Sequence, residues 1–282
     1  MIAEILIYDS VTKLPARADH AVAYCASHGG GYSGSLVLKA GLRGAILCDA
    51  GIGLRQAGIA SLAMLEAAGV PAATVGHRTA RIGDGQDGYT RGLVSYVNSV
   101  AAALGLKVGD SCKKALDTLA RHAPAFPFNK VTAQQIKEHR STVHLPGGGQ
   151  AILVDSNSLI TQADAGQIVV CGSHGGLLGG DPLSAVRFDV RAIVFNDADG
   201  GADLAGLSRL PALDQRGIVG ACVSAWTACI GDGQSSYETG VISALNNTAM
   251  NHGAVLGMTA QAFVLRLSAT PNSNPNDSYI NK

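Results

Sequence analysis

Short apolar runs recur along the first part of the chain, and longer stretches with a different spacing of apolar residues separate them. The runs lie at residues 5–8, 21–25, 44–48 and 72–75. Each is the length of a strand and hardly alternates between apolar and polar positions, which is typical of strands buried on both faces of a sheet. We therefore expect four strands here.

The intervening stretches predict helices. In residues 56–68, Ile59, Leu62 and Leu65 recur at the three-residue spacing of a helix face. A second helix is expected over residues 89–104, after a Gly-Asp-Gly loop. Strands that alternate with helices form βαβ units, in which the strands are parallel and the helices cover the sheet. The predicted fold class is therefore α/β.

The chain also resembles itself. At an offset of 146 residues, Cys-Ala-Ser-His-Gly-Gly at 25–30 matches Cys-Gly-Ser-His-Gly-Gly at 171–176. At an offset of 148, 23 of the 57 residues from 49 to 105 are identical to those from 197 to 253. The best-matched block, Ile-Gly-Asp-Gly-Gln, occurs once in each half. This self-similarity predicts an internal duplication, with two pseudo-twofold-related halves that each hold a mainly parallel sheet flanked by helices.

The repeats predict a division of the chain into four segments. We expect a first α/β repeat at 1–115, a connector at 116–146, a second α/β repeat at 147–265 and a mobile tail at 266–282. Within the connector, a short helix is predicted at 132–139, followed by the loop signal Pro-Gly-Gly-Gly. The tail is rich in Asn, Ser and Pro, a composition common in poorly ordered termini.

Composition narrows the classes of partner. The formal net charge is +0 and only 15% of the 282 residues are charged, against roughly 25% in a typical soluble domain. A neutral chain of this kind is not expected to bind nucleic acid. Hydrophobic residues make up 47% of the chain, so we expect part of the surface to be buried in a homo-oligomer.

The sequence also bears on the cellular compartment of the protein. The six cysteines show no Cys-x-x-Cys spacing, so neither a zinc knuckle nor a disulfide scaffold is indicated. The first residues contain acids and lack a basic region before the apolar run, unlike a signal peptide. The longest notable uncharged stretch, 217–231, is too short and too rich in glycine to cross a bilayer. We expect a cytoplasmic protein with no membrane partner.

Polar residues follow the predicted strands, at the edge where ligands bind in parallel sheets. A serine and a histidine follow the second strand, and an aspartate follows the third; the same residues recur in the second half. The catalytic candidates are Ser27, His28, Asp49, Ser173, His174 and Asp197. A hydroxyl nucleophile, an imidazole base and an orienting carboxylate are the groups needed for acyl or amide-bond chemistry.

Further residues near these ends could bind the substrate. Glycine allows backbone N–H groups to approach an anion or a developing oxyanion, and cationic side chains attract a polar or anionic substrate. The substrate-binding candidates are Gly29, Gly30, His77, Arg78, Arg81, Asp84, Gly175, Gly176 and Asp232. The second half carries Ala225, Trp226 and Cys229 where His77, Arg78 and Arg81 stand in the first, so we expect one functional site per chain.

Each of these features also has a structural interpretation. The Ser-His-Gly-Gly turns could simply connect a strand to a helix. The strand-end aspartates and the Gly-Asp-Gly-Gln loops could cap the helices that follow them. Sequence alone leaves both interpretations open.

Motif searches exclude several chemistries. His-Gly-Gly-Gly at 28–31 matches a string of some lipases, but the chain has no Gly-x-Ser-x-Gly elbow. The glycines at 51 and 53 are not followed by the third glycine of a dinucleotide-binding fingerprint. Asp49, Asp84 and His28 could supply ligands to a metal ion, but no spacing demands one. We therefore expect no cofactor and no metal.

Two local resemblances suggest alternatives. Ile-Leu-Cys-Asp-Ala-Gly-Ile-Gly at 46–53 resembles the Cys-x-x-Gly-Ile-Gly turn of the B-type pentose-phosphate isomerases, which implies Cys48 as a base and the glycines as a sugar-phosphate site. The second half has Asn196 in place of Cys48. A strand ending in Ser-His-Gly, with the next ending near Cys, is similar to caspase-like cysteine peptidases, although their Gln-Ala-Cys signature is absent.

The function that these observations favour is hydrolysis of an amide or cyclic amide bond in a small-molecule substrate, through the Ser, His and Asp groups at the strand ends. Two alternatives remain: a sugar-phosphate-type isomerase with Cys48 as its base, and a non-catalytic binding protein for a small anionic metabolite.

Overall fold

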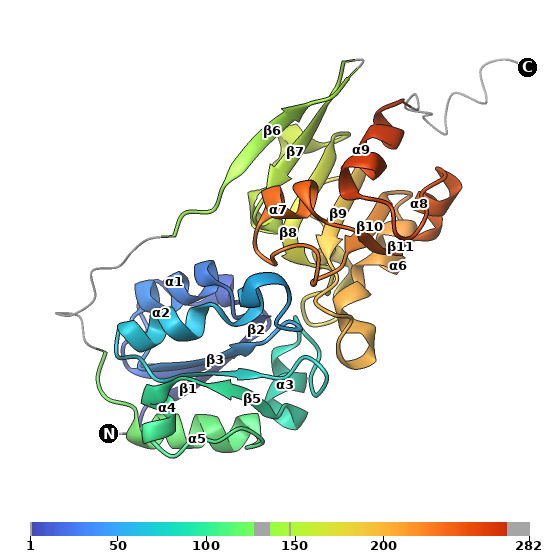
Figure 1. Ribbon diagram of the computed structural model, residues 1–282. Coiled ribbons are helices and arrows are strands. Elements are labelled where there is room, and N and C mark those ends of the chain that lie inside the picture. The colour runs from blue at the N-terminus through green and yellow to red at the C-terminus, as the bar shows by residue number, and fades with distance from the viewer. Residues whose placement is uncertain (1, 127–135, 147, 270–282) are drawn as a thin grey trace, which may run out of the picture.

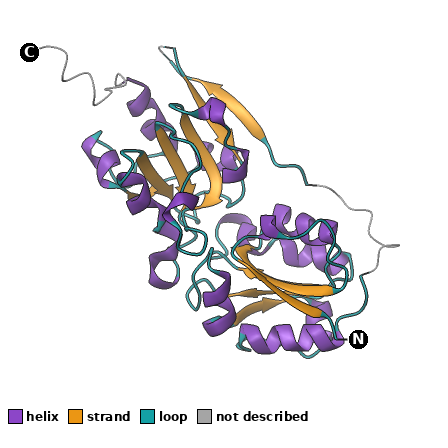
Figure 2. Cartoon of the chain, turned by 180° about the vertical axis from the view of Figure 1, so that it is seen from behind, coloured by secondary structure: helices purple, strands orange, loops and turns teal. Residues whose placement is uncertain are grey.

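The computed structural model describes residues 2–126, 136–146 and 148–269. These residues form a mixed α/β structure with a five-stranded and a six-stranded sheet, each flanked by helices (Figure 1). We call residues 2–126 the first unit and residues 136–269 the second unit. Figure 2 shows from behind that each unit has its own sheet.

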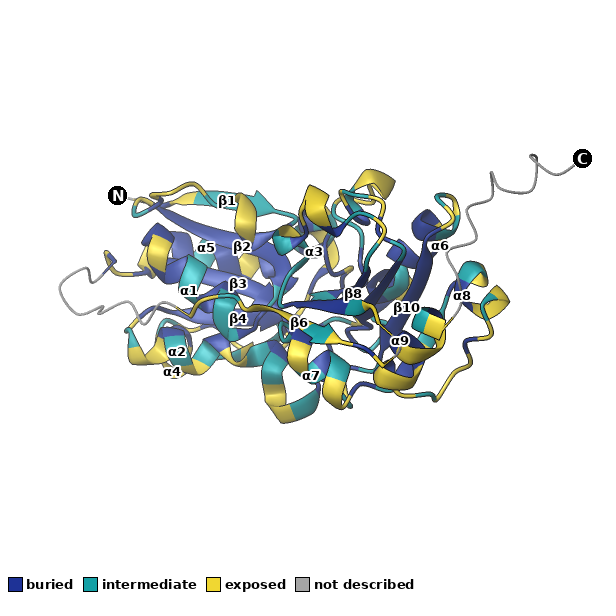
Figure 3. Cartoon of the chain, turned by 90° about the horizontal axis from the view of Figure 1, so that it is seen from above, coloured by how far each residue is buried: buried dark blue, intermediate teal, exposed yellow. Residues whose placement is uncertain are grey.

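The first unit is built on a sheet whose strands follow the order of the chain. The strands are β1 (Glu4–Tyr8), β2 (Ala21–His28), β3 (Gly44–Cys48), β4 (Ala72–Val75) and β5 (Val94–Val97). The first four are parallel, and β5 pairs with β4 in the antiparallel direction. The central strands are buried (Figure 3), as their continuous apolar sequences require.

Helices cover both faces of this sheet. α1 (Gly31–Ala40) and α2 (Ser61–Ala67) share a core on one face with residues such as Leu47. α3 (Gly85–Arg91), α4 (Ser99–Ala103) and α5 (Cys112–His122) lie on the other, where Leu116 and Leu119 pack near Tyr24. The short 3-10 segments Val11–Lys13 and Leu54–Ile59 follow β1 and β3.

The second unit repeats this order with one strand added at the edge. Its strands are β6 (Arg140–His144), β7 (Gln150–Val154), β8 (Ile168–His174), β9 (Ala192–Asn196), β10 (Val219–Val223) and β11 (Ile242–Leu245). β7 to β10 are parallel, whereas β6 and β11 pair with their neighbours in the antiparallel direction. The matching strand order suggests an internal duplication.

The helices of the second unit match those of the first with one exception. They are α6 (Arg209–Asp214), α7 (Gly233–Glu238), α8 (Asn247–Asn251) and α9 (Ala260–Ala269), with 3-10 segments at Asn157–Leu159, Gln162–Asp164, Pro182–Ser184 and Ala202–Leu207. After β8, in the position that α1 occupies in the first unit, residues 175–191 form a loop with a single 3-10 turn. This loop makes the two units different at the point where they meet.

The four strands expected from the sequence are confirmed, and β2 extends three residues further, to His28. The helix expected over 56–68 is divided into the 3-10 segment and α2. The helix expected over 89–104 is wrong, because β5 interrupts it. Gly92 and the β-branched Val94 and Val97 favour extended backbone here, and the Ser95 hydroxyl lies 3.0 Å from that of Thr74 on β4.

The segment boundaries expected from the sequence do not coincide with the ends of the helices and strands. α5 runs through the boundary at 115 and packs on the first sheet, and β6 lies inside the expected connector. Of the helix expected at 132–139, residues 136–139 are not helical and the others lie outside the described residues. Of the tail at 266–282, residues 266–269 belong to α9 and the rest also lie outside the described residues.

The carboxyl ends of the parallel strands in both units face the junction between the units. The Leu54 N–H donates to the carbonyl of Ala225 at 2.7 Å, and the Ala202 N–H donates to the carbonyl of His77 at 2.7 Å. Leu54 and Ala202 begin the 3-10 segments that follow β3 and β9, and His77 and Ala225 lie in the loops that follow β4 and β10. The sheet edge expected to bind ligands is therefore also the edge at which the units meet.

Candidate functional site

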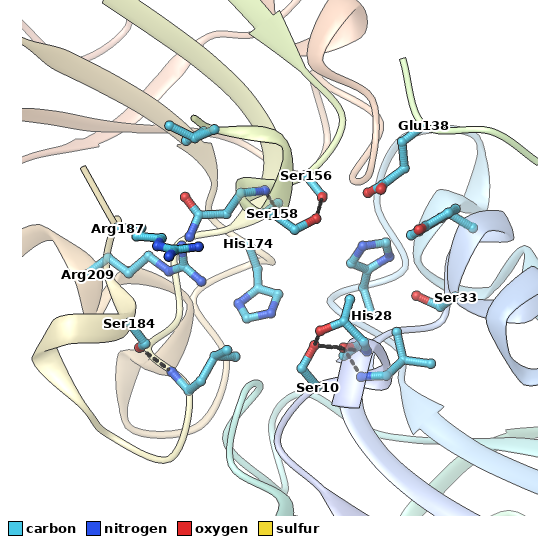
Figure 4. A pocket seen from close by; sticks show the side chains of 18 of the residues that line it. Ser10, His28, Ser33, Glu138, Ser156, Ser158, His174, Ser184, Arg187 and Arg209 are labelled. Carbon is cyan, nitrogen blue, oxygen red and sulfur yellow. Dashed lines mark hydrogen bonds between the residues drawn. The ribbon is translucent and has the colours of Figure 1, made fainter. Parts of the chain in front are cut away.

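A cavity of about 470 Å³ lies between the two units, and we call it the central cavity (Figure 4). Its walls are rich in hydroxyl groups from both units, and four apolar side chains complete them. The turns after β2 and β8 bring Ser27, His28, Ser173 and His174 together here. The two Ser-His-Gly-Gly segments, 146 residues apart in sequence, thus line one shared site.

The two histidines face each other across the cavity (Figure 4) and are held in the same way. His28 Nδ1 accepts the N–H of Gly30 at 3.2 Å, and His174 Nδ1 accepts the N–H of Gly176 at 3.1 Å. A ring nitrogen that accepts a hydrogen bond carries no proton, so the neutral ring must carry its proton on Nε2. Both imidazoles therefore present an N–H donor on the side away from their own backbone.

Burial keeps both rings neutral. Loss of solvent lowers the pKa of His28 from 6.5 to about 4. Burial, with the charge of Arg209 adding to it, lowers the pKa of His174 well below its ordinary value. A histidine with a protonated Nε2 and a low pKa is a poor base and a good hydrogen-bond donor. It can polarise a carbonyl group or stabilise an oxyanion.

Each imidazole also packs against a glycine of the opposite unit. A Cβ on Gly231 would lie 3.0 Å from Cε1 of His28, and one on Gly83 would lie 3.4 Å from Cε1 of His174. Both glycines have positive φ and belong to the repeated Ile-Gly-Asp-Gly-Gln block. This block therefore supports the histidines from across the junction.

The hydroxyl groups of the serines beside the histidines accept hydrogen bonds from the backbone. Ser27 Oγ accepts the N–H of Val11 at 2.9 Å, and Ser173 Oγ accepts the N–H of Asn157 at 3.0 Å. Among the hydrogen bonds of the described residues, neither hydroxyl contacts an imidazole. The geometry favours a role for both serines in holding the turns after β1 and β7.

The glycines after the histidines also have internal partners. The Gly29 N–H donates to the carbonyl of Cys48 at 2.7 Å, and the Gly175 N–H donates to that of Asn196 at 2.8 Å. The N–H groups of the next glycines, Gly30 and Gly176, donate to the histidines as described above. These four groups thus build the turn and are not directed at a ligand.

The strand-end aspartates lie outside the central cavity. Asp49 Oδ1 accepts the N–H of His77 at 2.9 Å and that of Gly51 at 3.2 Å. Asp197 Oδ1 accepts the N–H of Ala225 at 2.8 Å. Both carboxylates hold loops that contain non-glycine residues with positive φ, a conformation that costs about 1–3 kcal/mol per residue. They do not orient the cavity histidines.

His77 joins the two units through ion pairs. Its Nδ1 lies 2.8 Å from Asp49 and its Nε2 lies 3.0 Å from Asp199 of the second unit. Carboxylates only accept hydrogen bonds, so both ring nitrogens carry protons. Burial opposes the charge of His77, but the two carboxylates outweigh it and raise the pKa of His77 above its ordinary value. Hydrogen bonds from His77 likewise outweigh burial and lower the pKa of Asp49.

The other expected binding residues are also spread along this junction. Arg78 is exposed and lies 3.3 Å from Asp199. Arg81 pairs with Asp203 at 2.9 Å and, with Asp84, lines a separate cavity of about 270 Å³. The cationic group expected around His77 therefore contacts second-unit carboxylates and does not line the central cavity.

Asp84 and Asp232 cap helices. Asp84 Oδ1 accepts the N–H of Asp87 in α3, and Asp232 Oδ1 accepts the N–H of Ser235 in α7. Replacing Asp84 with alanine is expected to lower the free energy of unfolding by about 1 kcal/mol, as measured by urea denaturation, and Asp232→Ala serves as the matched variant. Unchanged stability with strongly reduced ligand binding would instead assign Asp84 to the functional site.

Sequence reasoning missed Arg209. It begins α6, is only 2% exposed and lines the central cavity. Its Nε donates to the carbonyl of Gly176 and its Nη1 to that of Ala185, each at 2.8 Å. The first unit has Ser61 at the equivalent position. The replacement of this small residue by a charged one inside the repeat is the sequence feature that could have identified Arg209.

The cavity contains one carboxylate among its lining residues, Glu138, which was also missed. Its Oε1 is buried and has no hydrogen-bond partner among the residues that the structure describes. Burial and the nearby charge of Glu138 raise the pKa of Tyr32 to about 12. Glu138 lies in the expected connector, outside the motifs and repeats recognised in the sequence.

Cys48 does not line the central cavity, and its thiol is buried. Burial and the charge of Asp49 raise the pKa of Cys48 well above its ordinary value, so the geometry does not favour it as a base. Across residues 2–126, 136–146 and 148–269, no three His, Cys, Asp or Glu side chains group in a way that could hold a metal ion. The helices in the same residues are all too short or too polar to span a membrane.

The histidines make opposite contributions to the pH dependence of stability. The pKa values of His28 and His174 are lowered, so unfolding takes up protons below pH 6.5 and stability falls as pH falls toward about 4. The raised pKa of His77 stabilises the fold below pH 6.5, and this contribution is lost as pH rises through the folded value. Urea unfolding is expected to show maximal stability near pH 6.5.

Single substitutions separate these contributions. His174→Gln is expected to flatten the acid side of the stability profile, whereas His77→Gln is expected to remove the decline on the alkaline side. The same change of slope in both variants would contradict the assigned protonation states.

Together, the fold and the site define a two-unit α/β protein with a hydroxyl-rich cavity, two neutral imidazoles and a buried guanidinium at the junction. No protein-family model, curated protein or solved structure matches the chain.

Proposed function

We propose that the chain hydrolyses an amide or cyclic amide bond of a small molecule bound in the central cavity. The observation that carries this proposal is the pair of imidazoles whose Nδ1 atoms accept backbone N–H groups, which leaves each Nε2 as a donor. Two such donors could share one carbonyl oxygen. They would stabilise the charge that this oxygen gains when a nucleophile attacks the carbonyl carbon.

Glu138 is the group best suited to activate the nucleophile. As the single carboxylate that lines the cavity, it can take a proton from water while the water oxygen bonds to the carbonyl carbon. The carbonyl electron pair moves to the oxygen held by His28 and His174. When this tetrahedral intermediate collapses, the C–N bond breaks and the nitrogen takes the proton from Glu138.

A panel of small acyclic amides, lactams and cyclic imides tests this activity, with amine or carboxylate release as the readout. Wild-type protein is expected to hydrolyse at least one member, and Glu138→Gln is expected to lower its rate by about two to four orders of magnitude. The substitution keeps the side-chain volume, so the Tm should change little. Binding without hydrolysis of any member would instead favour a binding protein for a small metabolite.

The internal duplication and its pseudo-twofold axis form part of the proposal. Two of the backbone hydrogen bonds between the units are equivalent under the sequence offset of 148: Leu54 corresponds to Ala202, and His77 corresponds to Ala225. The packing of each histidine on a glycine of the opposite unit is reciprocal in the same sense. This reciprocity is what a twofold relation between two copies of one unit would produce.

We propose further that the chain acts as a homo-oligomer, on the basis of its few charges and large apolar fraction, and that it is cytoplasmic, on the basis of cysteines that lack disulfide-scaffold spacing. Light scattering at micromolar concentration is expected to give a mass at least twice 28.7 kDa. A monomer mass under these conditions would contradict the assembly.

A further inference from the structure

We infer that the substrate is an N-acyl α-amino acid or a close relative, with its carboxylate bound to Arg209 and Arg187. This inference rests on the proposed function for the identity of the scissile bond. The presence of a carboxylate in the substrate is inferred from the side chains of the second unit that line the central cavity.

Arg209 supplies a buried positive charge that has no counter-ion within residues 2–126, 136–146 and 148–269. Its hydrogen bonds within the described part of the chain go to backbone carbonyls, and its guanidinium carbon lies 4.7 Å from the centre of the Phe195 ring. No carboxylate of the described residues pairs with it. Because burying an unpaired charge is costly, an anion that enters the cavity would gain a strong interaction.

Nη2 of Arg209 is the nitrogen left for this anion. Nε and Nη1 are fixed by Gly176 and Ala185, which holds the guanidinium plane at the cavity wall. Arg187, exposed and also without a carboxylate partner in the described part of the chain, lies beside it in Figure 4. Two cations on one wall favour a carboxylate there.

Asn157 indicates which ligand group lies next to the ligand carboxylate. Its Nδ2 and Arg209 Nη1 both donate to the carbonyl of Ala185, at 3.5 and 2.8 Å, so the two side chains are neighbours. The Oδ1 of Asn157 is buried, and none of the described residues donates a hydrogen bond to it. A ligand N–H close to its carboxylate would satisfy this atom, and in an N-acyl α-amino acid both groups are attached to the same carbon.

The remaining contacts follow from this placement. The acyl carbonyl, one bond beyond the N–H, would lie toward His28 and His174, which Figure 4 shows between the cationic wall and Glu138. Apolar residues such as Leu178 and Leu183 could receive the amino acid side chain. Every part of the ligand then meets a chemically matched part of the cavity.

The test is isothermal titration of the full-length Glu138→Gln variant, which should not hydrolyse the ligand appreciably during the measurement, with three related compounds. N-acetyl-L-leucine has both the carboxylate and the N–H, N-acetyl-L-leucinamide lacks the charge, and 2-acetoxy-4-methylpentanoate replaces the N–H with oxygen. N-acetyl-L-leucine is expected to bind at least tenfold more tightly than either analogue. Equal binding of the neutral amide, or no binding of N-acetyl-L-leucine, would overturn the carboxylate assignment.

Variants identify the groups responsible. Arg209→Gln and the exposed Arg187→Gln are each expected to weaken N-acetyl-L-leucine binding, by more than tenfold and by about threefold to tenfold respectively. The matched control is Arg216→Gln. Arg216 also donates to a carbonyl of this loop, at 2.6 Å from Val186, but it pairs with Asp189 and does not line the cavity. If Arg187→Gln binds as tightly as the control does, the assignment fails even where Arg209→Gln does not fold.

These titrations are independent of turnover. Carboxylate-selective binding without hydrolysis would retain the ligand class and reject the hydrolase. Hydrolysis of neutral amides without carboxylate selectivity would retain the hydrolase and reject the ligand class.

Discussion

Alanine at His28 or His174 is expected to lower amide hydrolysis by about two to three orders of magnitude, the usual cost of losing one donor to a developing oxyanion. Each ring supplies one Nε2–H to the cavity, and the low pKa of each prevents it from acting as an imidazolium. The readout is kcat on the best amide of the panel. Wild-type KM would show that binding survives while stabilisation of the transition state is lost.

The control for these variants is His20→Ala. His20 is exposed and its Nε2 lies 3.0 Å from Glu4, far from any strand end that lines the cavity. Its removal is expected to leave kcat unchanged. Glutamine in place of either cavity histidine keeps an N–H donor and is expected to recover part of the lost rate. An unchanged rate in both alanine variants would show that the histidines only support the turns.

Alanine at Gly58 or Gly206 is expected to lower the free energy of unfolding by more than about 3 kcal/mol. A Cβ on Gly58 would overlap the carbonyl oxygen of Asp49, and one on Gly206 would overlap that of Asp197. These carbonyls belong to backbone that the strand-end loops hold in place, so they cannot move aside as a side chain would. Urea denaturation measures the change.

Gly69→Ala and Gly217→Ala are the matched controls. Both glycines have positive φ, but no atom lies within 4 Å of a Cβ placed there. Only the backbone conformation then opposes alanine, at a cost of about 1 kcal/mol. If Gly58→Ala and Gly206→Ala are no worse than these controls, the close packing of the loops after β3 and β9 is not important for stability.

Local patterns in the sequence predicted most of the fold. The strands β1 to β4 were visible because buried parallel strands are continuous apolar runs, and the repeat showed that the second unit would have matching strands. The helix predicted over 89–104 includes residues 93–97, because a mostly apolar segment of five residues fits either period. Pairing with β4 decides its conformation, and a local pattern does not contain that pairing.

The candidate site was visible in part. The Ser-His-Gly-Gly turns led to the central cavity because they end strands, and strand ends converge by topology. The tautomer of His28 depends on the N–H of Gly30, which the spacing of residues does not show. Arg209 starts a helix rather than ending a strand, and Glu138 lies outside the repeats. Their common location arises only from contact between the units.

The proposed role of His28 and His174 as hydrogen-bond donors to the ligand can be tested by measuring which ring nitrogen is protonated and whether it responds to the ligand. Long-range proton–nitrogen NMR on ¹⁵N-histidine-labelled protein, assigned with His28→Gln and His174→Gln, reports which ring nitrogen carries the proton. We expect two neutral rings protonated at Nε2 from pH 5 to pH 8, whose Nε2 signals shift when N-acetyl-L-leucine saturates the protein. Rings protonated at Nδ1, imidazolium signals at pH 7, or Nε2 signals that do not respond to the ligand would contradict this role.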